Sequence, residues 1–416
     1  MYFNIFSTLL NNKNAHGLTY VVNCFCMNIF TLLSGALAAV LIIGFFGVDF
    51  FTPSEDVETG PIRVGVIAPI TGPAAAYGEL MRDLMSIATE QINADGGING
   101  RQMLLVVEDG KCSGKDAASA AQKLISIDRV QLILGGFCSV ESIAAEPIAR
   151  KAGVMLVSPG SSAASLTNVS KYFARIYPSD AKQSELIAAE ALRSGHVHVA
   201  ALQEQTEYAS GVVQTFTNSM SAGGGAVSKE EFPTAVTDVR SIVTKSLARK
   251  PDAVFVVAQT QSAMRLLFSE LRAQGYRGQL YLNDVPAGDS ALLTEFADYL
   301  EGAVTSEFTA DPTNQKLQEM LAAYRARYGS DPLNLAYAQT DWDLPFLAAD
   351  ALRAVGNEGT KLASWFRSNV HEWSGASGLI SVGENGDPKV GHKLEIVKGG
   401  KAFPYTTANV TRPRAP

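Results

Sequence analysis

Beyond residue 60 the chain repeats one hydrophobic pattern. A short run of apolar, often β-branched residues is followed by a longer segment in which apolar residues recur every three or four positions, and this pair occurs seven times. Apolar runs without alternation are typical of strands covered on both faces, and the longer period is that of a helix. The pattern therefore predicts an α/β protein with parallel sheets between helices. The expected strands cover residues 62–68, 103–107, 130–134, 154–157, 197–202, 253–257 and 279–282.

These strands form two groups, each about as long as a small doubly wound domain. An extended segment, 171–178, leads from the first group to the second, which begins near Val197. Beyond residue 307, two longer helical patterns and one short strand remain, which are too few for a third domain. We therefore expect two discontinuous lobes and a tail. The lobes cover residues 61–178 with 308–377 and residues 179–307 with 378–407, and the tail covers 408–416.

The N-terminal region has a different character. Residues 29–51 are almost wholly apolar, and at about 1.5 Å per residue they could cross a hydrocarbon core about 30 Å thick. The pattern predicts either a retained membrane anchor or a signal segment, preceded by a poorly defined leader at 1–28 and followed by a polar linker at 52–60. In both cases we expect the folded part on the extracytoplasmic side of a membrane.

Composition and motifs narrow the function. The chain has 416 residues and a net charge of −7, which argues against a nucleic-acid partner. It contains no phosphate-binding loop, no dinucleotide-binding glycine motif and no serine-nucleophile elbow. The histidines have no serine, cysteine or carboxylate at catalytic spacing and no metal-ligand spacing. We therefore expect a protein that is not an enzyme and holds no cofactor or metal. The histidines are His16, His196, His198, His371 and His392.

The four cysteines divide by position. Cys24 and Cys26 belong to the leader, whereas Cys112 and Cys138 belong to the folded part. An even pair in an exported chain predicts a disulfide, and two reduced, buried thiols are the alternative.

Polar side chains follow most of the expected strands. In parallel α/β sheets, ligands bind beyond the carboxyl ends of the strands. Hydroxyl groups there suit a carboxylate and a single acid suits an ammonium, so the set predicts a small zwitterionic ligand. Each residue alone has a plainer interpretation, such as a helix cap or a turn. Their convergence at strand ends favours binding. The residues are Ser139, Ser161, Ser162, Tyr208, Gln259, Thr260, Asn283 and Asp284.

Three motifs in the first lobe carry a family resemblance. They are GVIAPITGPAAAYG at 65–78, INADGGINGR at 92–101 and LILGGFCSVESIAAEPIARKAGVMLVSPGSS at 132–162. Their order resembles the leucine/isoleucine/valine-binding family of periplasmic binding proteins. The resemblance implies a type I periplasmic binding protein fold: two Rossmann-like lobes with parallel sheets, joined by a three-strand hinge. It also implies a receptor that closes on a small amino-acid-like ligand for an ABC transporter permease.

The resemblance assigns roles to individual residues. Tyr77 lines the cleft, Ser139, Ser161 and Ser162 bind the ligand carboxylate, and Cys112 and Cys138 form the disulfide. In the second lobe Tyr208 packs on the ligand and Asp284 binds its ammonium, while Trp342 stands where a Tyr-Asp pair is common. Three departures imply a more polar pocket than one for leucine. These are Asp284 in place of glutamate, the pair Gln259 and Thr260 in place of glycine and an aromatic, and Trp342 in place of tyrosine.

Two other functions fit parts of the sequence. The first is a membrane-anchored ligand sensor or regulator of cell-wall synthesis on the same fold, which a retained anchor would favour. The second is an enzyme on an α/β scaffold, which turnover of an amide substrate would favour.

Overall fold

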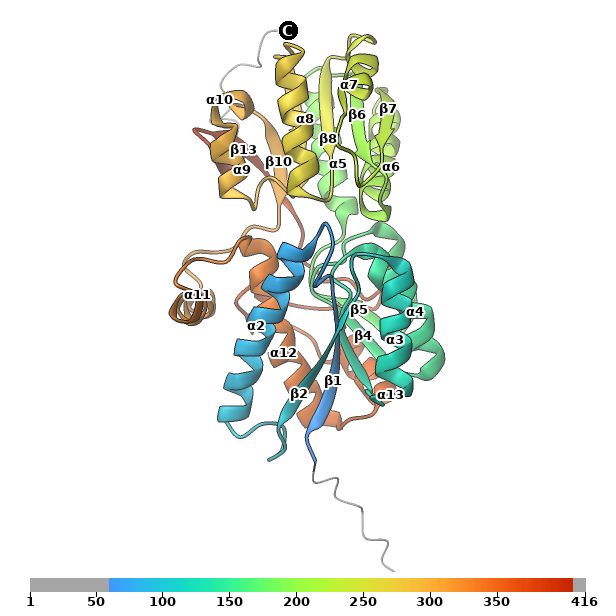
Figure 1. The fold of residues 1–416 in the computed structure, drawn as a ribbon, viewed down its shortest axis with the longest axis vertical. Coiled ribbons are helices and arrows are strands. Elements are labelled where there is room, and N and C mark those ends of the chain that lie inside the picture. The colour runs from blue at the N-terminus through green and yellow to red at the C-terminus, as the bar shows by residue number, and fades with distance from the viewer. Residues whose placement is uncertain (1–59, 407–416) are drawn as a thin grey trace, which may run out of the picture. The chain divides into compact units, whose positions relative to one another are not determined.

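The computed structural model describes residues 60–406 and contains two main sheets, each with helices on both faces (Figure 1). The first sheet has the order β2-β1-β3-β4-β5, and all its neighbouring strands are parallel. The strand order reverses beside β1, which is the place where ligands bind in open parallel sheets. The strands are β1 (Ile62–Ala68), β2 (Met103–Asp109), β3 (Leu132–Gly135), β4 (Met155–Ser158) and β5 (Phe173–Arg175).

Apolar residues on both faces of this sheet build the first lobe. One face packs against α2, α12 and α13, and the other packs against α3 and α4. Helix α11 packs on α2 and α12, away from the sheet. Helix bounds are α2 (Ala75–Ala94), α3 (Gly114–Ser126), α4 (Ser139–Ala152), α11 (Gln315–Tyr328), α12 (Leu335–Val355) and α13 (Gly359–Ser368), with a 3-10 turn η1 (Ala164–Leu166).

The second sheet has the order β14-β13-β10-β9-β8-β6-β7. Its strands from β6 to β10 are parallel, whereas β13 runs antiparallel to β10 and β14. Helices α5 and α6 cover one face, and α7 to α10 cover the other. The strands are β6 (His198–Glu204), β7 (Ala226–Phe232), β8 (Ala253–Val257), β9 (Gln279–Leu282), β10 (Val304–Glu307), β13 (Lys393–Lys398) and β14 (Lys401–Pro404). The helices are α5 (Asp180–Arg193), α6 (Glu207–Ala222), α7 (Arg240–Leu247), α8 (Gln261–Ala273), α9 (Ser290–Glu295) and α10 (Ala297–Leu300).

The chain passes between the lobes three times: after β5, after β10 and before β13. This arrangement confirms the predicted α/β fold with two parallel-sheet lobes. The last boundary differs from the expectation. Residues 378–388 pack on the first lobe, because Ile380 and Val382 lie in its core and Asp387 pairs with Arg175. A small hairpin, β11 (Trp373–Gly375) with β12 (Gly378–Ile380), also lies in this part of the chain.

The predicted membrane segment cannot be compared with the structure. Residues 1–28, 29–51, nearly all of 52–60 and the tail at 408–416 lie outside the described residues. Within residues 60–406, no helix combines the length and the apolar character needed to cross a membrane.

Candidate ligand-binding site

One pocket collects residues from both lobes. Loops after the strands of each sheet meet there, together with the first turn of α12. The volume is ≈ 20 Å³, which holds about one water molecule. An amino acid therefore enters only if the lobes part or the lining side chains rearrange. The lining residues are Tyr77, Phe137, Cys138, Ser139, Gly160, Ser162, Tyr208, Gln259, Val285 and Tyr337.

Three aromatic rings form the apolar wall of this pocket. Tyr77 stacks on Phe137 with ring centroids 5.5 Å apart, and Tyr337 meets both rings edge-on at 5.5 and 5.0 Å. The Phe137 ring fits because residue 160 is glycine, since a Cβ there would lie 2.7 Å from the ring. The wall suits the hydrocarbon part of a small ligand.

The side facing α4 is built to receive an anion. Ser139 is the first residue of α4, so the free N–H groups and the positive end of the helix dipole lie beside it. Its Oγ accepts hydrogen bonds from the backbone N–H groups of Ser162 (3.2 Å) and Ala163 (3.1 Å). Ser139 and Ser162 both line the pocket. Their hydroxyl groups and the helix N-terminus can together hold a carboxylate.

Ser161 has a different position from the one expected. Its hydroxyl donates to the carbonyl oxygen of Gly136 (2.8 Å) and contacts the hydroxyl of Ser142 (2.8 Å), so it faces the loop before α4. The residue is fully buried and does not line the pocket. The buried Arg175 donates hydrogen bonds to the carbonyl oxygens of Ser161 (3.2 Å) and Ala163 (2.9 Å), and so fixes the loop after β4. Ser161 therefore supports the loop that carries the neighbouring serines, and its side chain does not line this pocket.

The predicted acid, Asp284, lies directly behind the pocket wall. It follows β9 and is fully buried. Its Oδ2 accepts hydrogen bonds from the hydroxyls of Tyr177 (3.0 Å) and Tyr337 (3.2 Å), and its Oδ1 accepts one from Tyr208. Gln183 also donates to Oδ1, at 3.3 Å. Tyr208 and Tyr337 both line the pocket and donate to this carboxylate, so a ligand ammonium that bound Asp284 would replace tyrosine donors.

Burial makes the neighbours of Asp284 electrically neutral near pH 7. It raises the pKa of Asp180 to about 8, and the charge of Asp284 adds to this shift. The same two causes raise the pKa of Glu307 well above its usual range. Burial lowers the pKa of His392 to about 4. Protonated acids and a neutral imidazole therefore surround Asp284, and the region does not carry three full negative charges.

Trp342 lies outside the pocket, contrary to expectation. It packs with Leu80 and Leu84 between α2 and α11, and its ring is 5.5 Å from that of Phe346. Tyr337 lines the pocket instead. The two residues are five positions apart, and at about 100° per residue they project from nearly opposite sides of α12.

A disulfide joins Cys112 to Cys138, as expected, with 5.4 Å between the Cα atoms. Cys138 caps α4 immediately before Ser139. The buried carboxylate of Glu141 accepts hydrogen bonds from the backbone N–H groups of Cys112 (2.9 Å) and Cys138 (3.0 Å). Disulfide and carboxylate together fix the loop that presents Ser139 to the pocket.

Two α/β lobes with a shared pocket, a helix N-terminus on one side and a buried acid behind the other are the features of a two-lobed solute-binding protein. A family model described as a periplasmic binding protein matches residues 61–401, and the chain belongs to this family. It is 26% identical to the leucine-, isoleucine-, valine-, threonine- and alanine-binding protein of Pseudomonas aeruginosa, over 86% of this chain and 93% of the relative.

Solved structures show the same fold. The leucine-binding protein LivK of Thermotoga maritima superimposes with a TM-score of 0.75 at 25% identity, covering 83% of this chain and 98% of that one. The branched-chain amino acid transporter substrate-binding protein LivJ of Streptococcus pneumoniae, in complex with isoleucine, gives a TM-score of 0.73 at 24% identity, covering 82% and 97%.

Proposed function

We propose that the protein captures a small α-amino acid outside the cytoplasm and delivers it to an ABC transporter. The observation that carries this proposal is the polarity of the pocket. Ser139, Ser162 and the N-terminus of α4 lie on one side, and Asp284 lies behind the tyrosines of the other. A carboxylate and an ammonium would bind at opposite ends, with the hydrocarbon part against Phe137 and its neighbours.

The relatives support the ligand class and the transport role. Their names describe proteins that bind leucine, isoleucine, valine, threonine or alanine, or that serve branched-chain amino acid transporters. They favour transport over a sensor or a regulator of cell-wall synthesis. A family of binding proteins also favours a non-catalytic role. A transport role outside the cytoplasm also gives the apolar segment at 29–51 a function, because that segment would direct export or anchor the chain on the extracytoplasmic face of the membrane.

The mechanism follows from the connections between the lobes. Ser139 and Ser162 belong to the first lobe, whereas Asp284 belongs to the second. A zwitterion that contacts both lobes stabilises the closed form. The size of this stabilisation is the difference between the free energies with which the ligand binds the closed and the open forms. A permease that recognises the closed form would then receive loaded protein.

Calorimetric titration of the full chain tests this function. The ligands are leucine, isoleucine, valine, threonine and alanine, each compared with its analogue lacking the amine and its analogue lacking the carboxylate. We expect at least one α-amino acid to bind and both of its analogues to bind at least about tenfold more weakly. Equal binding of the analogue without an amine would contradict the ammonium site and favour a simple carboxylate as the ligand.

A further inference from the structure

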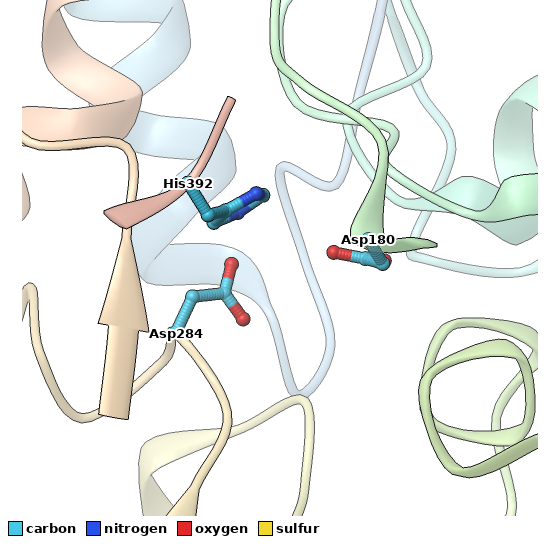
Figure 2. A group of neighbouring side chains, drawn as sticks. All are labelled: Asp180, Asp284 and His392. Carbon is cyan, nitrogen blue, oxygen red and sulfur yellow. The ribbon is translucent and has the colours of Figure 1, made fainter. Parts of the chain in front are cut away.

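Three buried side chains from distant parts of the sequence meet beside the hinge. Figure 2 shows Asp180, Asp284 and His392 facing a common space. Each can offer one oxygen or nitrogen atom, and these atoms all lie within 4.8 Å of one another. The side chains are 1%, 0% and 4% exposed, respectively. The cluster is therefore part of the interior and differs from the common case of surface acids that gather without a cation.

His392 gives the independent sign of a ligand. Neither Nδ1 nor Nε2 has a hydrogen-bond partner among the described residues, although both are buried. Oδ2 of Asp180 also lacks one within this part of the chain. Buried polar atoms are nearly always paired, because an unpaired group loses its hydration without compensation. In Figure 2 the side chain of His392 lies beside those of Asp180 and Asp284, so its unpartnered nitrogens are close to two acids.

No lysine or arginine side chain within residues 60–406 supplies a positive charge to Asp180 or Asp284. The buried Arg175 is paired with Asp387 at 2.7 Å and donates to backbone carbonyls of the neighbouring loop. Within residues 60–406, Asp180 and Asp284 take part in no ion pair with lysine or arginine. The existing donors to Asp284 are tyrosine hydroxyls and one amide, which are neutral.

We propose that Asp180, Asp284 and His392 bind a divalent transition-metal ion of the zinc class. One imidazole nitrogen and two carboxylate oxygens are a ligand set that Zn²⁺ accepts. Asp180 releases its proton to solvent when the ion binds, so that two carboxylates then balance the charge of the ion. At bond lengths of about 2.0–2.1 Å, tetrahedral ligands lie about 3.3 Å apart. Atoms now within 4.8 Å reach that spacing when the side chains rotate inward by roughly 1 Å.

The position of the cluster gives the ion a role. Asp180 begins α5 just after the first crossing between the lobes, and His392 precedes β13 just after the third. Asp284 belongs to the loop proposed to hold the ligand ammonium. A bound ion joins these three segments and occupies the carboxylate that an ammonium needs. Metal and amino acid therefore compete for Asp284. This competition rests on the proposed function, whereas metal binding alone does not depend on it.

Metal titration of the full chain without amino acid tests the site. The protein is first dialysed against a chelator, and Zn²⁺ binding is then followed by calorimetry. We expect wild type to bind one more Zn²⁺ ion per chain than His392→Gln or Asp180→Asn, or to bind that ion at least about tenfold more tightly. The exposed His371→Gln is the matched control and is expected to behave as wild type.

Two further measurements keep the outcomes distinct. Circular dichroism melts verify folding of each variant, and Asp180→Asn, which keeps the side-chain volume, decides the question if His392→Gln does not fold. Equal stoichiometry and affinity in wild type and folded variants would overturn the proposal, since any ion would then bind elsewhere, for example at leader cysteines. An amino-acid titration of metal-free wild type is run in parallel. If wild type binds amino acids but shows no Zn²⁺ site that depends on Asp180 or His392, the metal proposal is wrong and the proposed function stands.

Discussion

Replacing Asp284 by asparagine tests the ammonium site most directly. The side chain is fully buried and accepts hydrogen bonds from Tyr177, Tyr208 and Tyr337. Asparagine keeps its volume and removes its charge. A charge-assisted hydrogen bond contributes about 1.5–3 kcal/mol, and a buried one is little screened by salt. Asp284→Asn should therefore weaken α-amino acid binding by about 10- to 150-fold.

The assay separates the ammonium contact from a general disturbance. Wild type and Asp284→Asn are each titrated calorimetrically with an amino acid and with its analogue lacking the amine. The exposed Asp95→Asn is the charge-matched control. We expect the variant to lose affinity for the amino acid only. Because three tyrosine donors would face an amide in place of a carboxylate, a lower melting temperature is also expected, so folding is verified first. A variant that binds the amino acid within twofold of wild type would refute the reasoning.

The remaining predictions concern stability and the pocket wall. Replacing Cys112 and Cys138 by serine should lower the free energy of unfolding by about 3 kcal/mol, since the disulfide spans a sequence separation of 26; denaturant titration with and without reductant measures this. Tyr337→Ala should weaken amino-acid binding at least about tenfold, whereas Trp342→Phe should lower stability by about 1–2 kcal/mol and leave affinity unchanged, as calorimetry and melts of both variants will show. Burial raises the pKa of Glu141 from 4.5 to about 7, so between these pH values the folded state keeps a proton that the unfolded chain releases. The free energy of unfolding should therefore fall by about 3 kcal/mol as the pH rises from 4.5 to 7. Denaturant titration across this pH range measures the fall, and Glu141→Gln should remove it.

The sequence predicted best the strands that consist of uninterrupted apolar runs. The expected bounds at 62–68, 253–257 and 279–282 agree with β1, β8 and β9, because uninterrupted apolar runs mark strands covered on both faces. The edge strand β7 was missed. Its sequence, AVSKEEF, is mostly polar and only two of its seven residues are buried, so its place in the sheet depends on pairing with β6. The pattern of apolar and polar residues within β7 does not indicate this pairing.

The site was predicted only in part for a similar reason. Ser139, Ser162, Tyr208 and Asp284 follow strands, and strand ends mark the binding edge of a parallel sheet. Tyr337 projects from a helix that is buried on nearly every side, so its sequence does not show which face meets the pocket. The cluster of Asp180, Asp284 and His392 was also missed, because these residues lie far apart in the sequence and have no characteristic spacing.

Residues from two of the connections between the lobes lie beside Asp284. The hydroxyl of Tyr177 lies 3.0 Å from Oδ2 of Asp284 and 3.1 Å from Oε1 of Glu307. Tyr177 belongs to the first crossing between the lobes, and Glu307 ends β10 at the start of the second. An ammonium at Asp284 would compete with the Tyr177 hydrogen bond and so act on two crossings at once. We infer that substitutions at these residues change the equilibrium between open and closed lobes as well as the contact with the ligand. Tyr177→Phe, which removes only the hydroxyl, should therefore shift affinity even though Tyr177 does not line the pocket.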